Sequence, residues 1–236
     1  MTRLYLNQTL IEKAEIALSL EQSHHIHNVL RYKKEDVIRV FNETNGEWFA
    51  KIIALTKKQV IIEIQHQHLQ PQNTATLWLA FAPLKQDANT FLLEKATELG
   101  VTHLQPLWME RSNTQRLNHQ RWEKIVTEAS QQCERQDIPK ILESQNFIHF
   151  LKDLPSHVKW LVALERYQGP ILSKTLSPES LLPYGFIVGP EGGFSPSERK
   201  LLESNPSVQP TSLGPRILRA ETAALSVLAI TQTMVL

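Results

Sequence analysis

The stretch that decides the fold is IVGPEGGFS at residues 187–195, a glycine-rich loop between two regular elements. The apolar residues 186–188 in front of it are typical of a buried strand. Behind it, Ser195 can cap a helix, Pro196 suits the first helical position, and Glu198 completes a capping box. The pattern predicts a strand, a loop and a helix. Ligands of open α/β sheets bind at such loops, beyond the carboxyl ends of the strands.

The composition of this loop narrows its chemistry. Its glycines allow the backbone to approach a ligand closely and to adopt positive φ. The Lys-Ser/Thr pair of a P-loop is absent, and so is the GxGxxG spacing of dinucleotide-binding folds. Glu191 would repel a phosphate, so the loop favours a neutral or cationic ligand. The competing interpretation is a tight turn that needs glycines for its geometry alone.

Working outward, strand-like and helix-like segments alternate on both sides of the loop. Strands are expected at 77–82, 101–107, 160–164 and 186–188, and helices at 91–99 and 121–135. Gly100 follows the first of these helices, where a helix commonly ends. The alternation predicts an α/β domain with a mostly parallel sheet.

The N-terminal part has a different pattern. Runs rich in β-branched residues predict strands at 37–41, 48–55 and 60–64, and Asn45-Gly46 is a hairpin turn signal because both positions tolerate positive φ. A small β-barrel or β-sandwich follows. The polar stretch 66–76 is the best linker. We therefore expect two domains, residues 1–70 and residues 74–236.

Length and composition set broad limits. The 236 residues are 42% hydrophobic, enough for a substantial core, and the formal net charge is +1. This balance argues mildly against a nucleic-acid partner. No signal peptide or membrane span is expected, and residues 220–236 predict a buried terminal helix. Cys133 is the single cysteine, which suits a reducing cytoplasm.

A second informative stretch is SLGPRILRAETAALSVLAI at residues 212–230. It places a Gly-Pro pair, two arginines and Glu221 directly before an apolar helix. The plain interpretation is a loop with surface arginines and a capping carboxylate.

Together the two stretches resemble the paired signatures of the SPOUT methyltransferase superfamily. They are most similar to its ribosomal RNA small-subunit methyltransferase E family, the (uracil-N3)-methyltransferases. The similarity covers nearly the whole chain, and its further motifs are KATELGV at 95–101, Pro106, Arg111-Ser112, EASQQCERQDIP at 128–139 and HHIHNVLRYKKEDVIRVF at 24–41. The chain departs from the family pattern at Glu35, where glycine is usual, and at residues 42–46, where a shorter turn is common.

The resemblance implies a C-terminal SPOUT-type α/β domain with a deep trefoil knot and an N-terminal PUA-like β-barrel that docks RNA. It implies a homodimer that methylates N3 of a specific uridine in 16S ribosomal RNA of the small subunit. The implied cofactor, S-adenosyl-L-methionine, would be held by Leu164, Glu165, Val188, Gly189, Pro190, Glu191, Gly192, Gly193, Leu213, Gly214, Ile217, Leu218 and Arg219.

The position of the last arginine beside this loop suggests a mechanism. N3 of uracil must lose a proton before methylation, so a cation near a uracil oxygen would stabilise the developing charge. We assign this role to Arg219. Glu221 is either the general base or a residue that orients Arg219 or caps the helix.

Contacts with RNA are expected from basic residues that position a phosphate backbone. The candidates are His27, Arg31, Lys33, Arg111, Arg121 and Arg135, with Lys34 and Arg116 close to them in sequence. His24, His25 and His27 lack further ligands at suitable spacing, so no metal site is expected.

Two other functions remain open. A superfamily enzyme could act on another RNA or atom, such as guanine N1 or a ribose 2′-oxygen. A non-catalytic RNA-binding factor for ribosome assembly is the alternative from another class.

Overall fold

The computed structural model describes residues 1–56, 59–112, 117–180 and 182–235. Its residues form two compact units. One comprises residues 1–73 and 130–137, and the other comprises residues 74–129 and 138–236. The segment 130–137 therefore groups with the N-terminal unit, although the sequence pattern placed it in the second domain.

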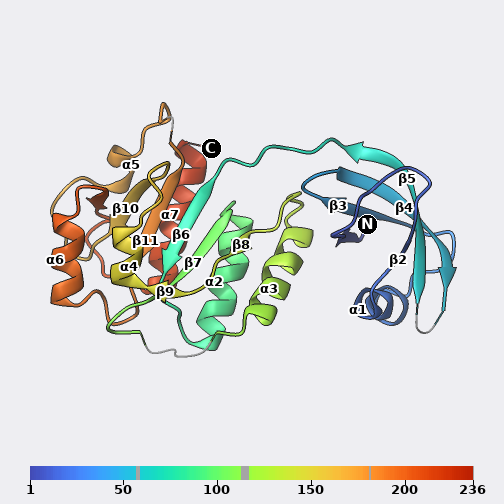
Figure 1. Ribbon diagram of the computed structural model, residues 1–236, viewed down its shortest axis with the longest axis horizontal. Helices are drawn as coiled ribbons and strands as arrows, with labels where there is room; N and C mark the ends of the chain where they lie inside the picture. The colour runs from blue at the N-terminus through green and yellow to red at the C-terminus, as the bar shows by residue number, and fades with distance from the viewer. Residues whose placement is uncertain (57–58, 113–116, 181, 236) are drawn as a thin grey trace. The chain divides into compact units, whose positions relative to one another are not determined.

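The N-terminal unit is built on a five-stranded sheet (Figure 1). Its strands, in the spatial order β1-β3-β4-β5-β2, are β1 (Arg3–Tyr5), β3 (Val37–Asn42), β4 (Gly46–Leu55), β5 (Val60–Leu69) and β2 (Glu15–Ala17). Alternate apolar residues of β3, β4 and β5 form one buried cluster, together with Ile26. Ile26 belongs to η1 (His25–Val29), a π-helical turn that continues α1 (Leu20–His24). Period-two alternation thus places this apolar cluster on one face of the sheet.

Two details of this unit differ from the sequence prediction. Residues 66–69 are part of β5 and not of the linker, because the strand pairs with β4 as far as Glu47↔Leu69. In the turn between β3 and β4, only Gly46 has positive φ, at 74°, and Asn45 does not. Residues 43–45 connect the two strands, and Gly46, the first residue of β4, takes the left-handed conformation.

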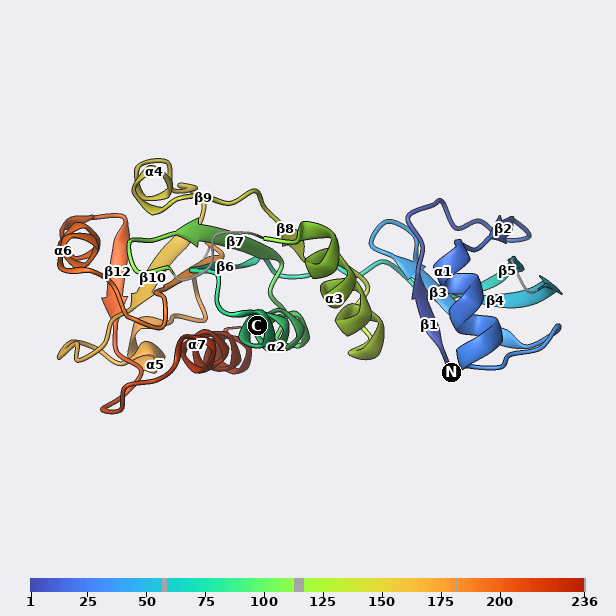
Figure 2. The same cartoon turned by 90° about the horizontal axis from the view of Figure 1, so that it is seen from below.

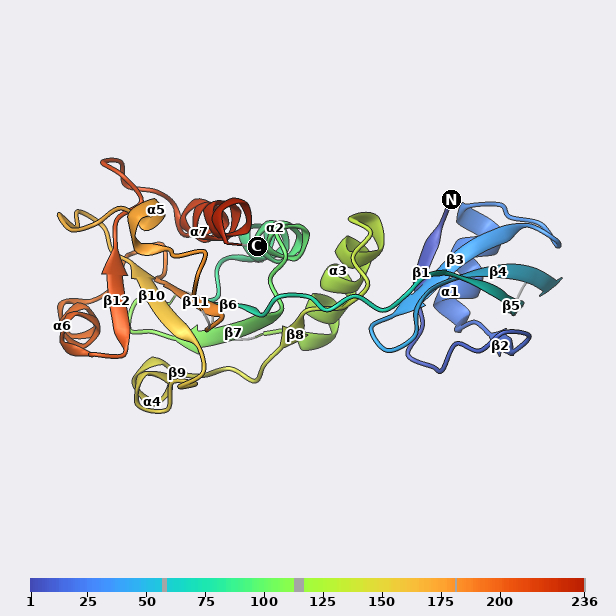
Figure 3. The same cartoon turned by 90° about the horizontal axis from the view of Figure 1, so that it is seen from above.

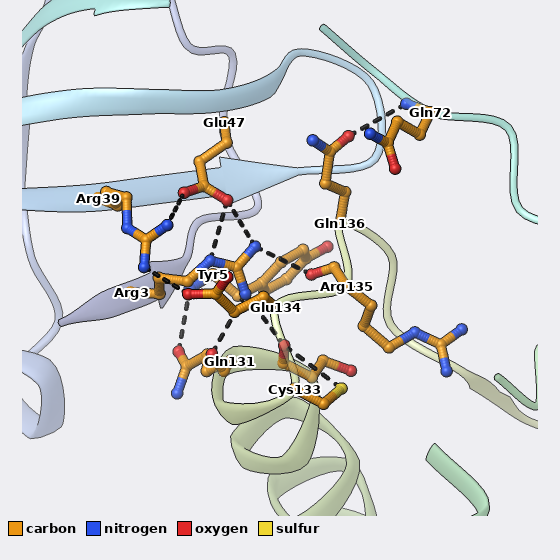
Figure 4. Close-up of polar contacts among 11 residues, drawn as sticks. Arg3, Tyr5, Arg39, Glu47, Gln72, Gln131, Cys133, Glu134, Arg135 and Gln136 are labelled. Atoms are coloured by element: carbon orange, nitrogen blue, oxygen red, sulfur yellow. Dashed lines mark hydrogen bonds and ion pairs between the residues drawn. The ribbon is translucent and has the colours of Figure 1, made fainter. Parts of the chain in front are cut away.

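A buried ion pair lies on the other side of this sheet (Figure 4). Arg3 donates to one carboxylate oxygen of Glu47 from Nε at 2.9 Å and from Nη2 at 2.7 Å. The other oxygen lies 3.0 Å from Nη1 of Arg39. The Arg3 and Glu47 side chains are only 2% and 1% exposed. The Arg3 guanidinium also stacks 4.1 Å from the ring centre of Phe41.

The same arginine fixes the segment 130–137 to the N-terminal unit (Figure 4). Its guanidinium donates to the backbone carbonyls of Ser130, Gln131 and Arg135. Ser130 and Gln131 lie in the last turn of the helix His119–Gln132, and Arg135 follows it. Carbonyls at a helix C-terminus lack helical partners and attract a cation. Arg39 adds a 2.6 Å bond to Glu134. The unit is thus completed by residues distant in sequence.

The second unit is an α/β layer structure (Figure 2). All described pairings in its sheet are parallel, in the order β12-β10-β11-β6-β7-β8, with β9 also on β7. The strands are β6 (Leu77–Phe81), β7 (His103–Trp108), β8 (Lys140–Ile141), β9 (Gln145–Asn146), β10 (Lys159–Ala163), β11 (Tyr184–Val188) and β12 (Val208–Thr211). This confirms the predicted α/β class.

Helices cover both faces of this sheet (Figure 3). One face carries α2 (Gln86–Glu98), α5 (Leu172–Thr175) and α7 (Ala220–Met234), and residues of α3 (His119–Gln132) pack in the same cluster. The other face carries α4 (Phe147–Lys152) and α6 (Pro196–Ser204). In β6, Leu77, Leu79 and Phe81 face the first layer, whereas Trp78 and Ala80 face the second. Burial on both faces explains why this strand is continuously apolar.

Local chemistry sets the helix ends near the loops of interest. The capping box at α6 is present, with the Ser195 side chain accepting from the backbone of Glu198. Gly100 has φ of 81° just after α2, as its position predicted. The predicted helix 121–135 ends earlier, at Gln132. Among the described residues, no helix combines the length and apolar character needed to cross a membrane.

Candidate functional site

The two stretches at residues 187–195 and 212–230 come together in space. The loop after β11 carries Gly189–Gly193, and the loop after β12 carries Leu213–Leu218. The strand β10 lies between β11 and β12 in the sheet, so the loop after β10 lies beside the other two loops. It is held there by Leu164, whose N–H donates to the Thr211 carbonyl at 3.2 Å. Three neighbouring carboxyl ends thus define one edge of the sheet.

These loops enclose a cleft with an empty volume of about 800 Å³, counted to its open mouth. The described residues that line it are Arg111, Ala163, Leu164, Glu165, Arg166, Val188, Gly189, Pro190, Gly192, Gly193, Phe194, Arg199, Leu213, Gly214, Arg216, Leu218, Ala220 and Ala223. A cleft lined by residues of several loops and by apolar as well as charged side chains suits a small organic ligand rather than a single ion.

Glycine is required in the wall of this cleft for two distinct reasons. Gly193 has φ of 67°, and its N–H closes a tight turn on the Pro190 carbonyl at 2.8 Å. A Cβ on Gly189 would stand 3.0 Å from the ring of Phe194, which is closer than ordinary contact. The backbone can therefore form the surface that a ligand would meet.

The electrostatics of the cleft differ from those of the glycine loop alone. Glu191 is exposed and does not line the cleft, whereas the arginines 111, 166, 199 and 216 do. Glu165 is the acidic residue among the lining residues. The positive charge comes from other loops and from α6, which is why the loop sequence alone suggested a neutral or cationic ligand. An anionic group is well matched to this rim.

The structure places the sequence-predicted cofactor residues as follows. Ten of them line the cleft, namely Leu164, Glu165, Val188, Gly189, Pro190, Gly192, Gly193, Leu213, Gly214 and Leu218. Three do not: Glu191, Ile217, which is 59% exposed, and Arg219. Arg219 stands at the N-cap of α7, between the lining residues Leu218 and Ala220.

The proposed catalytic pair shows no direct contact. Arg219 is exposed and Glu221 is half-buried in the first turn of α7. Among the described residues, no ion pair or side-chain hydrogen bond joins them, and neither side chain caps the helix. A carboxylate in this first turn still favours the positive end of the helix dipole.

Several lining residues were not predicted from sequence. Arg216 lies within the stretch 212–230, so its position two residues after Gly214 could have predicted that it lines the cleft. Arg199 stands one turn into α6, and helical side chains lean toward the N-terminus, here toward the glycine loop. Arg166 has φ of 54°, and nothing in the sequence pattern marks it.

The predicted RNA contacts are dispersed. Arg111 lies in the cleft, where its Nη1 donates to the Gly192 carbonyl at 2.8 Å. Arg135 is only 10% exposed and pairs with Asp137 at 2.6 Å. Arg121, Arg31 and Lys33 are exposed, and His27 is half-buried. Arg116 lies outside the described residues.

The loop that carries Arg111 contains one group with a shifted pKa. Hydrogen bonds from Ser197 and then from Ser195 lower the pKa of the Glu110 carboxyl, and the Arg111 charge acts in the same direction. The ionised form of Glu110 is therefore favoured. Among the described residues, no group of three His, Cys, Asp or Glu side chains is arranged to hold a metal ion.

Comparison with known proteins assigns the chain to a family. The sequence profile of the RNA methyltransferase domain matches residues 70–232, and that of the RNA methyltransferase PUA domain matches residues 19–65. A ribosomal RNA small subunit methyltransferase E of Rickettsia conorii is 36% identical over 96% of this chain and 93% of its own length. The chain belongs to the ribosomal RNA small subunit methyltransferase E family.

Other members of the methyltransferase E family agree with this assignment. The Buchnera aphidicola protein of that name is 32% identical over 98% of this chain and 93% of its own length. The crystal structure of the Neisseria gonorrhoeae protein, bound to S-adenosyl methionine, matches with a TM-score of 0.90 at 29% identity. The match covers 99% of this chain and 97% of that one, so the similarity includes both units.

Proposed function

We propose that this chain is an S-adenosyl-L-methionine-dependent methyltransferase that methylates N3 of a specific uridine in 16S ribosomal RNA of the small subunit. The observation that carries the proposal is the single cleft formed by residues 189–193 and 213–218 in a chain of this family.

The residues of the cleft fit the cofactor. Leu164, Val188, Leu213 and Leu218 offer apolar surface for an adenine ring, and the backbone groups of the glycine loop would read its edge. A cationic rim suits the carboxylate of the methionine moiety. Glu165 suits hydroxyl or ammonium groups. When bound, the cofactor supplies an electrophilic methyl group.

The protein must prepare uracil for this transfer. The base has to leave its stack, since N3 is not accessible within a base pair. A positioned cation lowers the cost of charge on the uracil oxygens, and a positioned base adds roughly 10²–10⁴-fold. We assign the cation to Arg219 at the N-cap of α7, with Glu221 as the base or as an orienting residue. Arg216, which lines the cleft, is a further candidate for the cation.

The N-terminal unit supports RNA docking. Its π-helical turn η1 contains no acidic residue in its first turn, and it leads into Arg31, whose φ is 57°. Lys33 and Lys34 follow and are exposed. π-Helical turns and left-handed non-glycine residues are frequent at functional sites. His27, Arg31 and Lys33 would contact phosphates here, with Arg111, Arg121 and Arg135 contributing from elsewhere in the chain.

The proposal includes the finer features of the family. The C-terminal unit would contain the deep trefoil knot, the N-terminal unit would form the PUA-like barrel, and two copies would form a homodimer. The enzyme would act in the cytoplasm on the small ribosomal subunit, without a metal ion.

The test is a methylation assay with mapped product. The purified protein is incubated with labelled cofactor and either small ribosomal subunits or naked 16S RNA, and the modified nucleoside is identified by mass spectrometry. We expect 3-methyluridine at one position. A methylated guanine or ribose would redirect the assignment to another superfamily activity, and absence of cofactor binding by calorimetry would favour the non-catalytic alternative.

The role of Arg219 has its own test. Arg219→Ala should lower turnover with cofactor affinity unchanged, and Arg216→Ala serves as the comparison. Near-normal turnover of the first variant would contradict its role.

A further inference from the structure

The side chain of Glu198 in α6 makes a contact that its capping role does not require. One carboxylate oxygen accepts the N–H of Ser195 at 2.8 Å, which completes the capping box. The other accepts the N–H of Glu110 at 2.8 Å, from the loop after β7. The residue is only 2% exposed, and among the described residues no ion pair neutralises it. One carboxylate therefore connects the backbones of Ser195 and Glu110, which are 85 residues apart in the chain.

The burial of the Glu198 carboxylate depends on the hydrogen bonds that it accepts. A buried carboxylate is costly unless hydrogen bonds replace its water. Bonds from backbone N–H groups to an ionised carboxylate are among the stronger hydrogen bonds in proteins. A capping box alone also forms at an exposed helix end, as at α1, where Ser19 and Gln22 form one with two bonds of 3.2 Å. Burial of Glu198 is thus explained by the second loop.

The second loop carries a wall of the cleft. Arg111 follows directly on Glu110, and its Nη1 donates to the Gly192 carbonyl at 2.8 Å and lies 3.5 Å from the Phe194 carbonyl. Its side chain lies 3.5 Å from the place that a Cβ on Gly192 would take. Ser197 strengthens the connection with a 2.7 Å bond to the Glu110 carboxylate. The position of Arg111 against the glycine loop therefore depends on where Glu198 holds the Glu110 backbone.

We propose that Glu198 is a positioning residue for the cofactor site: it holds the Glu110-Arg111 backbone against the glycine loop, so that Arg111 completes the wall of the cleft. This inference rests on the proposed function, because it takes the cleft to be the site of S-adenosylmethionine.

Calorimetric titration with S-adenosylmethionine tests the proposal without requiring turnover. Glu198→Gln leaves one oxygen for two N–H groups, so one loop is released. Glu198→Asp keeps the charge, but its shorter side chain cannot span both loops. We expect each variant to raise the Kd about tenfold. Ser195→Ala is the control for helix capping and for the bond from Ser195 to the Glu110 carboxyl, since it removes the hydroxyl that makes both and leaves the two backbone contacts of the Glu198 carboxylate in place. It should destabilise α6 with a Kd within about twofold of the unmodified chain.

A double-variant cycle separates positioning from general destabilisation. Arg111→Ala should itself raise the Kd for S-adenosylmethionine. If Glu198 acts through Arg111, combining Arg111→Ala with Glu198→Gln should raise the Kd little further. Full multiplication of the two effects would overturn the proposal.

Hydrogen exchange of the Glu110 amide gives a readout that is independent of any ligand. It should be slow in the unmodified chain and in Ser195→Ala, and at least about tenfold faster in both Glu198 variants. Faster exchange together with an unchanged Kd would overturn the positioning role. Failure of the proposed function looks different, because the unmodified chain would then not bind S-adenosylmethionine at all.

Discussion

Replacing Glu47 by glutamine should destabilise the N-terminal unit strongly. The carboxylate is 1% exposed and receives two bonds from Arg3 on one oxygen, while Arg39 lies 3.0 Å from the other. The glutamine is nearly isosteric, so it leaves the packing intact. It removes the charge, and its amide nitrogen is a hydrogen-bond donor. That donor faces an arginine, which has no acceptor atom.

The size of the expected destabilisation follows from the buried Arg3 cation, which loses its charged partner. The Arg3 side chain is 2% exposed, so its cation cannot recover water in the folded state. Breaking a buried pair by removing one partner costs about 3–5 kcal/mol. Arg39 loses less, because it keeps its bond to Glu134 and is more exposed. We therefore expect a loss near the lower end, about 3 kcal/mol.

Hydrogen exchange of peptides from β3 and β4 is the suitable assay, since it reports on this unit alone. A loss of about 3 kcal/mol should accelerate their slowest amides at least about a hundredfold. Lys51→Gln is the control in the same sheet, because it breaks the exposed pair with Glu35 and should cost about 0–1 kcal/mol. Combining Glu47→Gln with Arg3→Met should cost less than the sum of the two single changes. Acceleration below about tenfold, or strict additivity, would refute the reasoning.

Three further outcomes are expected. Gly193→Ala forces alanine to φ of 67° without a steric clash. It should lower the free energy of unfolding by about 1 kcal/mol, measured by thermal unfolding, and should weaken S-adenosylmethionine binding, measured by calorimetry. An unchanged melting temperature together with an unchanged Kd would contradict the strained turn. Glu35→Gly should stabilise the N-terminal unit by about 0.5 kcal/mol in urea unfolding, because relief of φ of 75° outweighs an exposed pair; a loss of stability would show the reverse. Burial lowers the pKa of His103, and the charges of Lys140 and His157 act in the same direction. The unfolded chain therefore binds a proton at this residue more readily, so the free energy of unfolding should decline as the pH falls below 6.5, the ordinary pKa of histidine. His103→Gln should lack this decline in melting temperature, and a variant that keeps it would exclude His103 as the source.

Much of the fold was readable because the local patterns were consistent. The apolar runs predicted as strands at 77–82 and 186–188 coincide with β6 and with the second part of β11, which are buried on both faces. Ser195 with Glu198 marked the start of α6 correctly. Gly100 ended α2 as expected. In each case the determining interaction lies within a few residues along the chain.

The rest depended on contacts between distant residues. Nothing in the sequence near Arg3 shows that its partners are Glu47 and carbonyls of the segment 130–137. Strand β5 extends beyond its apolar pattern because pairing with β4 satisfies the backbone of residues 65–69, of which Gln65, His66, Gln67 and His68 are polar. In the cleft, the glycine loop was identified from its composition, but Arg166 and Arg199 come from other elements and gave no local signal. The second contact of Glu198 was equally invisible.

The discontinuous N-terminal unit has a consequence for how the chain is made. During synthesis, residues 1–73 emerge well before the segment 130–137 that supplies carbonyls to Arg3. Until that segment is translated, the guanidinium and the Phe41 ring lack part of their native surroundings. The first unit therefore cannot finish folding until residues 130–137 have been made, by which time residues 74–129 of the second unit have already been synthesised. A fragment cut at the polar connection after Leu69 should be a poor mimic of the unit in the intact protein.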